Sequence, residues 1–233
     1  HMKIYRAGVI GAGFIGQVHV ETIRRLGNAQ VVALTDMVNP EKIAEKLNIP
    51  HWFSDYKEMI DTMDLDIVHI CTPNNTHFEI AMYALEHGIN VICEKPMTTS
   101  VSDAEKLVRK AEETGLIAAI NFHNRFYPMT NHLMNIIKDG ELGDVFSISG
   151  SYCQDWLLYD TDYSWRLETA ESGDTRVIAD IGSHWMDLAE FVTGLQITEV
   201  CADFSTIHPV RKKPNKTVLA FSTEKSKEDD YSK

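Results

Sequence analysis

Short apolar runs alternate with segments of helical periodicity over the first 120 residues. Five apolar runs indicate buried strands at residues 5–13, 31–37, 66–73, 90–96 and 116–122. Nearly continuous apolar character is typical of strands covered on both faces, as in a parallel sheet. Helical spacing between them predicts helices within residues 17–27, 40–49, 76–88 and 100–115. Strands alternating with helices predict an α/β fold, a doubly wound parallel sheet of Rossmann type.

Several small residues mark where these helices begin and end. Gly88 and Gly115 follow the last apolar positions of two helices and are suited to C-terminal caps. Ser100 or Ser102 is suited to capping the start of the fourth helix.

The pattern changes near residue 122. A helical run that follows Tyr127-Pro128 ends at Asp139-Gly140, and a further helix is expected over residues 183–193. Alternation over 145–152 predicts a strand with one open face, and strands are also expected at 198–206 and 217–222. We therefore expect a Rossmann-type domain at residues 2–122, followed by an α+β domain with a mostly antiparallel open sheet at 123–233.

Composition and net charge limit the classes of partner that the protein can bind. The formal net charge of −12 argues against nucleic acid and anionic membranes as partners. No apolar stretch reaches the roughly 18 residues of a membrane helix, and there is no signal-peptide pattern. The four cysteines are far apart in the sequence, and Cys71 and Cys93 fall within apolar runs. We expect a cytoplasmic protein with reduced cysteines.

The sequence Gly11-Ala12-Gly13-Phe14-Ile15-Gly16 has the spacing G-x-G-x-x-G between a strand and a helix. The first glycine permits a tight turn, the second lets the backbone approach a pyrophosphate, and the third allows close helix packing. The N–H groups at the start of the helix would bind the anion. Glycine spacing alone is a weak signal, but its position here favours a dinucleotide site.

Asp36 ends the next strand, 20 residues beyond Gly16. A carboxylate at this position accepts hydrogen bonds from the adenosine ribose and repels a 2′-phosphate, and no arginine follows directly. The prediction is NAD rather than NADP. The alternative is an ordinary turn followed by a solvated aspartate.

Two further motifs follow buried strands, and ligands bind beyond the carboxyl ends of such strands. Residues 71–77 read CTPNNTH, and Glu94-Lys95-Pro96 occupies the equivalent place after the next strand. Partial burial would lower the pKa of Lys95 toward the range useful in catalysis. Alternatively, His77 is a polar residue at a helix start and Lys95 a surface lysine.

In the second half, Asp180, His184 and Asp187 are spaced four and three residues apart. If this turn is helical they share one face and present carboxylate and imidazole groups together. A metal site is disfavoured because no second histidine has supporting spacing. A capping aspartate beside a packed histidine is the remaining alternative.

Together these motifs resemble the glucose–fructose oxidoreductase / inositol dehydrogenase / MocA family of NAD(P)-dependent dehydrogenases. The resemblance extends from residue 3 to about 205 and rests on GAGFIG, CTPNNTHFEIA, EKP, NFHNRFYP, SWR and DIGSHWMDL, in the family's order. It implies transfer of a hydride between NAD and a secondary alcohol of a sugar, cyclitol or related polyol, in a homo-oligomer (dimer or tetramer).

The resemblance also implies residue roles. Lys95 and His184 would be the catalytic pair, and Asp180 would help to hold the substrate. Which of Lys95 and His184 is the general base stays open. Arg125 or Trp165-Arg166 would lie near the nicotinamide. The expected cofactor contacts are Gly11, Gly13, Phe14, Ile15, Gly16, Asp36, Thr72, Pro73, Asn74, His77, Glu94, Lys95, Asn124, Trp165 and Arg166.

The chain departs from the family pattern in two ways. It has SGDTRVIAD where members usually carry a glycine-rich stretch, which is expected to reshape the substrate pocket. Members also usually run well past 300 residues, so we expect a C-terminally shortened chain with an incomplete second sheet. Two other functions remain: an NAD-dependent glycosidase of the same family, and a non-catalytic NAD-binding sensor.

Overall fold

The computed structural model describes residues 3–215, which form two compact units. Unit 1 comprises the chain up to Asn121 together with residues 170–174. Unit 2 comprises residues 122–169 and the chain from Thr175 onward.

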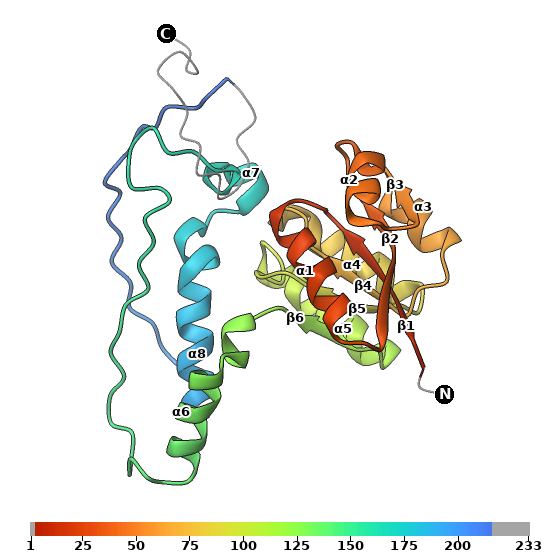
Figure 1. The fold of residues 1–233 in the computed structure, drawn as a ribbon. Helices are drawn as coiled ribbons and strands as arrows, with labels where there is room; N and C mark the ends of the chain where they lie inside the picture. Colours follow the sequence, from red (N-terminus) through yellow and green to blue (C-terminus); the bar gives the residue numbers. More distant parts are fainter. Residues whose placement is uncertain (1–2, 216–233) are drawn as a thin grey trace. The chain divides into compact units, whose positions relative to one another are not determined.

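Unit 1 is built on a six-stranded parallel sheet in the order β3-β2-β1-β4-β5-β6 (Figure 1). Its strands are β1 (Tyr5–Ile10), β2 (Ala29–Thr35), β3 (His51–Phe53), β4 (Ile67–Ile70), β5 (Asn90–Cys93) and β6 (Ala118–Ile120). The order reverses between β1 and β4, so the chain leaves these two neighbouring strands in opposite directions across the sheet. A crevice at the carboxyl ends of such strands is where open α/β sheets bind ligands.

Helices cover both faces of this sheet. They are α1 (Phe14–Arg25), α2 (Pro40–Leu47), α3 (Tyr56–Thr62), α4 (His77–Glu86) and α5 (Val101–Thr114), with the 3-10 turn η1 (Asn74–Thr76) before α4. One apolar core joins α1 and α2 to the sheet, and a second joins α3, α4 and α5 to it. The strands β1, β2, β4 and β5 are largely buried between these helices, which explains their nearly continuous apolar sequences.

The sequence-based prediction of a Rossmann-type α/β fold is confirmed. Ser100 caps α5 by accepting a hydrogen bond from the Asp103 N–H at 3.2 Å, and Gly115 ends it in the left-handed conformation. Strand β3 and helix α3 were not anticipated. Only three residues make β3, at the edge of the sheet, and they lie between Pro50 and Ser54 rather than within a longer apolar run.

Unit 2 is helical where it is regular. It contains η2 (His123–Phe126), α6 (Pro128–Lys138), η3 (Trp165–Leu167), the π-helical turn η4 (Ile178–Gly182) and α8 (Ser183–Thr193). The short helix α7 (Thr169–Ser172) includes residues of both units. The expected helices ending near Asp139 and spanning 183–193 are present, and α6 packs against α8.

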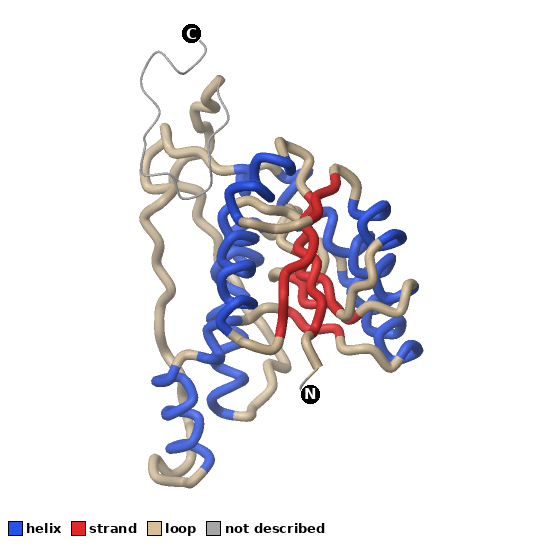
Figure 2. Tube along the Cα trace, turned by 45° about the vertical axis from the view of Figure 1, so that its right-hand side comes forward, coloured by secondary structure: helices blue, strands red, loops and turns tan. Residues whose placement is uncertain are grey.

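The strands expected at 145–152 and 198–206 are not formed. Both segments belong to long loops, drawn in tan in Figure 2, and unit 2 has no β-strand within residues 122–215. A strand requires a hydrogen-bonded neighbour, so alternation alone does not create one. The strand expected at 217–222 lies outside the described residues.

An ion pair holds η2 to α8. The Arg125 Nε donates to both carboxylate oxygens of Asp187, at 2.9 and 2.8 Å. The Asp187 side chain is 7% exposed, whereas that of Arg125 is 40% exposed. Removing the arginine therefore leaves a buried anion, while removing the aspartate leaves a cation that water can reach.

We expect Arg125→Ala to lower the free energy of unfolding of unit 2 by about 3 kcal/mol, which is more than Asp187→Ala lowers it. The reason is that Arg125→Ala leaves a buried carboxylate unpaired, whereas Asp187→Ala leaves an exposed guanidinium. Urea unfolding followed by far-UV circular dichroism measures both variants. An equal loss of unfolding free energy in the two variants would contradict this prediction.

No helix within residues 3–215 is both long and apolar enough to cross a membrane.

Candidate functional site

The glycine turn connects β1 to α1 at the carboxyl edge of the sheet. Gly11 has φ +86°, and a Cβ atom there would lie 2.8 Å from the Cys71 carbonyl carbon. At Gly16 a Cβ would lie 2.0 Å from the Gly11 carbonyl oxygen. These two positions therefore require glycine for the turn itself.

Gly13 differs, because a Cβ added there would meet no atom within 4 Å. Helix α1 begins directly after it at Phe14-Ile15, with no side-chain cap and no acidic residue in its first turn. The N-terminus of this 12-residue helix, with its backbone N–H groups and the positive end of its dipole, therefore lies next to open space at Gly13. This arrangement fits a dinucleotide pyrophosphate.

Asp36 follows β2 on the same edge of the sheet. Its Oδ2 accepts from the Ala12 N–H at 2.8 Å and its Oδ1 from the Val38 N–H at 2.9 Å. The carboxylate is thereby fixed against the glycine turn, which suits the ribose contact predicted for it.

Replacing Asp36 with asparagine keeps an acceptor for the turn and removes the negative charge. We expect the affinity for NADP⁺ relative to NAD⁺ to rise about tenfold, because a charge that repels the 2′-phosphate is lost. Calorimetric Kd values for both nucleotides measure this, and Asp55→Asn, at the start of α3, is the matched control. An unchanged ratio of the two Kd values would show that Asp36 does not discriminate between them.

The loop after β4 is tied to the loop after β5 by His77. This side chain is fully buried, with Nδ1 2.7 Å from the Pro96 carbonyl oxygen and Nε2 3.0 Å from that of Thr72. Burial lowers the pKa of His77, although both carbonyls oppose this shift. The geometry gives His77 a positioning role between the two loops.

Other residues of the loop after β4 also lie at this edge. Asn74 is buried and donates from Nδ2 to the Ser172 carbonyl at 3.0 Å. The Thr72 hydroxyl accepts a hydrogen bond from that of Thr76 at 2.7 Å. Thr72 and Pro73 are only partly buried, so part of each is accessible to a ligand.

Glu94 and Lys95 directly follow β5, and the peptide bond from Lys95 to Pro96 is cis. Lys95 is partly buried. The Glu94 side chain is 12% exposed and lies 3.0 Å from His19 Nε2. The motifs of unit 1 therefore gather at one edge of the sheet, as the sequence predicted for strands ending side by side.

In unit 2, Asp180 lies within η4 and is buried. Its Oδ1 is 3.2 Å from Arg166 Nε, and its Oδ2 is 3.7 Å from an Arg176 guanidinium nitrogen. Burial lowers the pKa of Arg176, and the charges of Arg211 and Arg166 add to this effect, while Asp180 opposes it. Arg176 belongs to the stretch that departs from the family pattern.

His184 follows one turn later, on α8, and is also buried. Aromatic rings surround its imidazole, with centroids of His123 at 5.2 Å, Phe122 at 5.9 Å and Tyr152 at 6.1 Å. The turn from η4 into α8 is helical, and it buries Asp180, His184 and Asp187 together. Asn124, in η2, is buried too, and Trp165 in η3 stacks under the guanidinium of Arg166 at 4.6 Å.

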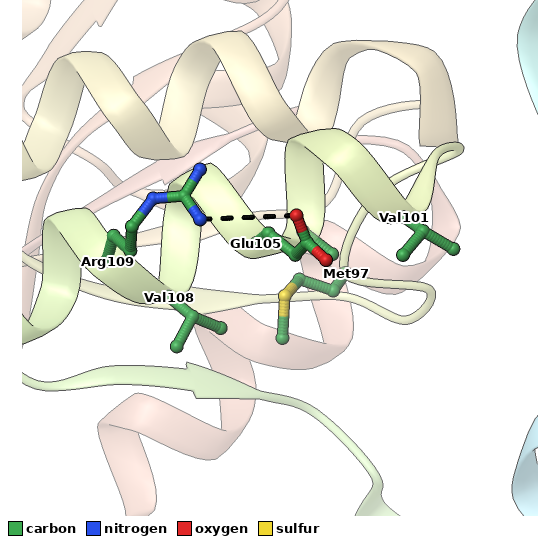
Figure 3. A pocket seen from close by; sticks show the side chains of 6 residues that line it. Met97, Val101, Glu105, Val108 and Arg109 are labelled. Carbon is green, nitrogen blue, oxygen red and sulfur yellow. Dashed lines mark ion pairs between the residues drawn. The ribbon is translucent and has the colours of Figure 1, made fainter.

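Unit 1 also has a hollow on its surface that does not include these residues. This hollow on α5 contains none of the expected site residues and is lined by Met97, Val101, Ala104, Glu105, Val108 and Arg109. Figure 3 labels five of these side chains, all except Ala104. Within residues 3–215, no group of three or more histidine, cysteine or acidic side chains is arranged to hold a metal ion. Cys71 and Cys93 are buried thiols.

The sequence did not reveal a polar network under the site. His19, His69 and Asn121 join Glu94 inside unit 1. One signal was present: His19 lies three residues after Gly16, on the face of α1 that also buries Val20 and Ile23. A histidine on an otherwise apolar face requires a partner, but the sequence does not name it.

Comparison with known proteins identifies the family. The model of an oxidoreductase family with an NAD-binding Rossmann fold matches residues 5–122, and that of the GFO/IDH/MocA C-terminal domain matches residues 130–231. The chain belongs to the GFO/IDH/MocA family. The family resemblance seen in the sequence is thus confirmed, and NAD is the cofactor of its Rossmann domain.

Relatives within the GFO/IDH/MocA family act on sugars and cyclitols. Levoglucosan dehydrogenase of Pseudarthrobacter phenanthrenivorans is 29% identical over 90% of this chain and 56% of its own length. Myo-inositol 2-dehydrogenase of Thermotoga maritima is 27% identical over 87% and 59%. A crystal structure of levoglucosan dehydrogenase with NADH and levoglucosan has a TM-score of 0.79 at 26% identity, covering 82% of this chain and 55% of that one. The chain spans somewhat more than half the length of these relatives.

Proposed function

We propose that this protein is an NAD-dependent dehydrogenase that oxidises a secondary alcohol of a sugar, cyclitol or related polyol. The observation that carries the proposal is the placement of Lys95 at the end of β5, on the sheet edge that also holds the glycine turn and Asp36. A nicotinamide dehydrogenase needs a proton-handling group at this edge. The names of the sugar and inositol dehydrogenases in the family support the substrate class.

We assign the two units different tasks. Residues 2–122 would hold NAD, through the glycine turn, Asp36, the loop of Thr72 and Asn74, and Glu94. Residues 123–233 would select the substrate and take part in homo-oligomerisation, which stays a prediction, as does a cytoplasmic location. Asn124 and Trp165-Arg166 stay candidates for cofactor contacts.

NAD⁺, when bound, supplies the two-electron acceptor. The residues of the chain handle the proton and the orientation of the alcohol. We assign His184 as the general base that accepts the proton of the substrate hydroxyl, because imidazole is the side chain that accepts protons near neutral pH. Lys95 donates a hydrogen bond to the same oxygen and stabilises its developing negative charge.

Asp180 is assigned to hold a neighbouring hydroxyl. Its ion pairs with Arg166 and Arg176 favour one orientation of the carboxylate, and an oriented acceptor helps to place the reacting carbon.

The proposal is tested by incubating the chain with NAD⁺ and a panel of sugars, cyclitols and their glycosides. Growth of NADH absorbance with one of the polyols is the expected result. Glycoside cleavage without net NADH would overturn the proposal in favour of a glycosidase. Micromolar binding of NAD⁺, measured by calorimetry, with neither activity would overturn it in favour of a sensor.

A further inference from the structure

Four polar side chains from separate elements meet beneath the sheet edge that carries Lys95. His19 on α1 has its Nε2 3.0 Å from the Glu94 Oε1 and its Nδ1 2.9 Å from the Nδ1 of His69 on β4. Asn121, just after β6, donates from Nδ2 to the same Glu94 oxygen at 2.6 Å. His19 and His69 are less than 10% exposed. The network therefore connects the helix of the glycine turn with the residue next to Lys95.

The direction of the hydrogen bonds follows from the charge of Glu94. Burial would raise the pKa of Glu94, but the hydrogen bonds from His19 and Asn121 and the charge of Lys95 hold it below its usual value. An ionised carboxylate only accepts, so the Nε2 of His19 must carry a proton. Burial, together with the charge of His19, lowers the pKa of His69 to about 3, so His69 is neutral at ordinary pH.

Folding alone does not account for such a network. Unit 1 already has two extensive apolar cores, and buried ionic groups are often replaced by packed apolar residues with no loss of stability. The network instead fixes the position of the Glu94 carboxylate. Two donors from α1 and the end of β6 converge on one oxygen of Glu94, and this fixes the chain where it leaves β5.

We propose that His19 is a positioning residue that orients the Glu94 carboxylate and thereby couples the helix of the glycine turn to Lys95. The part concerning Lys95 rests on the function proposed above. NAD bound at the turn would contact the start of α1. Because His19 lies on this helix and bonds Glu94, a shift of α1 would change the position of Glu94 at the end of β5. His19 itself touches neither substrate nor reacting atoms in this scheme.

The first experiment measures Glu94 without any need for turnover. Carboxyl ¹³C NMR of glutamate-labelled protein follows Glu94 through a pH titration, with Glu94→Gln assigning its signal. We expect His19→Leu to raise the pKa of Glu94 by about one unit, because a donor to the charged form is lost. His19→Gln, whose amide keeps a donor near the same place, should restore most of the shift. An unmoved pKa in His19→Leu would overturn the proposal.

Other groups that act on this carboxylate must be controlled in the titration. Lys95 lies next to it, and Glu94 in turn acts on Cys71, Cys93 and His77. Burial raises the pKa of both thiols, so neither thiol changes charge across the Glu94 titration. Burial lowers the pKa of His77 toward the carboxylate range and that of His69 to about 3, so the ring signals of both histidines are followed in the same titration. Asn121→Ala removes the second donor and shows how far the loss of one donor raises the pKa of Glu94. If His19→Leu does not fold, His19→Ala takes its place, with the same rise expected and the same unmoved pKa overturning the proposal.

The second experiment reads the coupling to Lys95 through turnover of a polyol substrate. We expect His19→Leu to lower kcat about tenfold and to leave the KM for the polyol within about twofold, because the loss is in orientation rather than in substrate contact. His87→Leu, an exposed histidine of the same unit, is the matched control and should change neither. If His19→Leu raises the pKa of Glu94 but leaves kcat unchanged, the proposed coupling to Lys95 is overturned. Absence of turnover in the wild type would refute the proposed function, while the NMR result still decides the role of His19.

Discussion

Replacing Gly16 with alanine is expected to destabilise unit 1 by about 3 kcal/mol and to abolish detectable NAD⁺ binding. The Cβ of alanine would lie 2.0 Å from the Gly11 carbonyl oxygen and 3.0 Å from its carbonyl carbon. Both are backbone atoms of the same tight turn, so relief requires the turn to open or α1 to move away. Inserting an atom into a packed site without room costs 1–3 kcal/mol or more, and here no flexible side chain can yield.

Gly13→Ala is expected to weaken NAD⁺ binding without destabilising unit 1. The added Cβ meets nothing within 4 Å, and Gly13 has φ −66°, which alanine adopts readily. We expect unchanged or slightly higher stability, since alanine reduces the entropy of the unfolded chain. The new methyl group would occupy the space assigned to the pyrophosphate, so the Kd for NAD⁺ should rise at least about tenfold.

Scanning calorimetry with and without NAD⁺ measures both variants, because the transition of unit 1 is the one that the nucleotide shifts upward. Gly16→Ala should lower that transition and remove its response to NAD⁺. Gly13→Ala should keep the transition and weaken the response. If Gly13→Ala binds NAD⁺ as the wild type does, the turn is not the pyrophosphate site.

The sequence was most informative where burial is two-sided. The strands β1, β2, β4 and β5 lie in apolar runs because helices cover both faces of the sheet there. The edge strands β3 and β6 each have two exposed residues out of three. The sequence indicated β6 because it lies within the apolar run at residues 116–122, whereas β3 lies between Pro50 and Ser54 and went unnoticed. Alternation at 145–152 and 198–206 indicated strands that unit 2 does not form in the described residues, because a strand depends on a neighbour that the local sequence cannot specify.

The same distinction applies to the site. Motifs at the ends of parallel strands were predictable, since topology alone brings them to one edge. Contacts between distant residues were not: His19 and Glu94 are 75 positions apart, and Arg125 and Asp187 are 62 apart. Asp180 was expected to serve the substrate, and the structure adds that two arginines hold it, one of them from the stretch that departs from the family pattern.

Lys95→Ala is expected to lower the turnover of a polyol substrate by about 100- to 1000-fold, the loss typical of removing one donor that stabilises a developing oxyanion. The Kd for NAD⁺ should change much less, because the glycine turn and Asp36 carry the nucleotide. Turnover is measured by NADH absorbance and binding by calorimetry. Lys106→Ala, an exposed lysine paired with Asp103 in the same unit, is the matched control and should keep full activity. Near-normal turnover in Lys95→Ala would refute the assigned chemistry.

The pH dependence of kcat then assigns the general base. A neutral imidazole is needed to accept the hydroxyl proton, so with His184 as the base kcat falls as the pH drops through the range where this imidazole gains a proton. His184→Ala should remove this acidic limb and leave a low, flat rate, while Lys95→Ala lowers the rate and keeps the limb. If the limb disappears in Lys95→Ala and persists in His184→Ala, the lysine is the base and the imidazole the donor. The two variants together therefore distinguish the alternatives that neither the motif spacing nor the placement of the side chains separates.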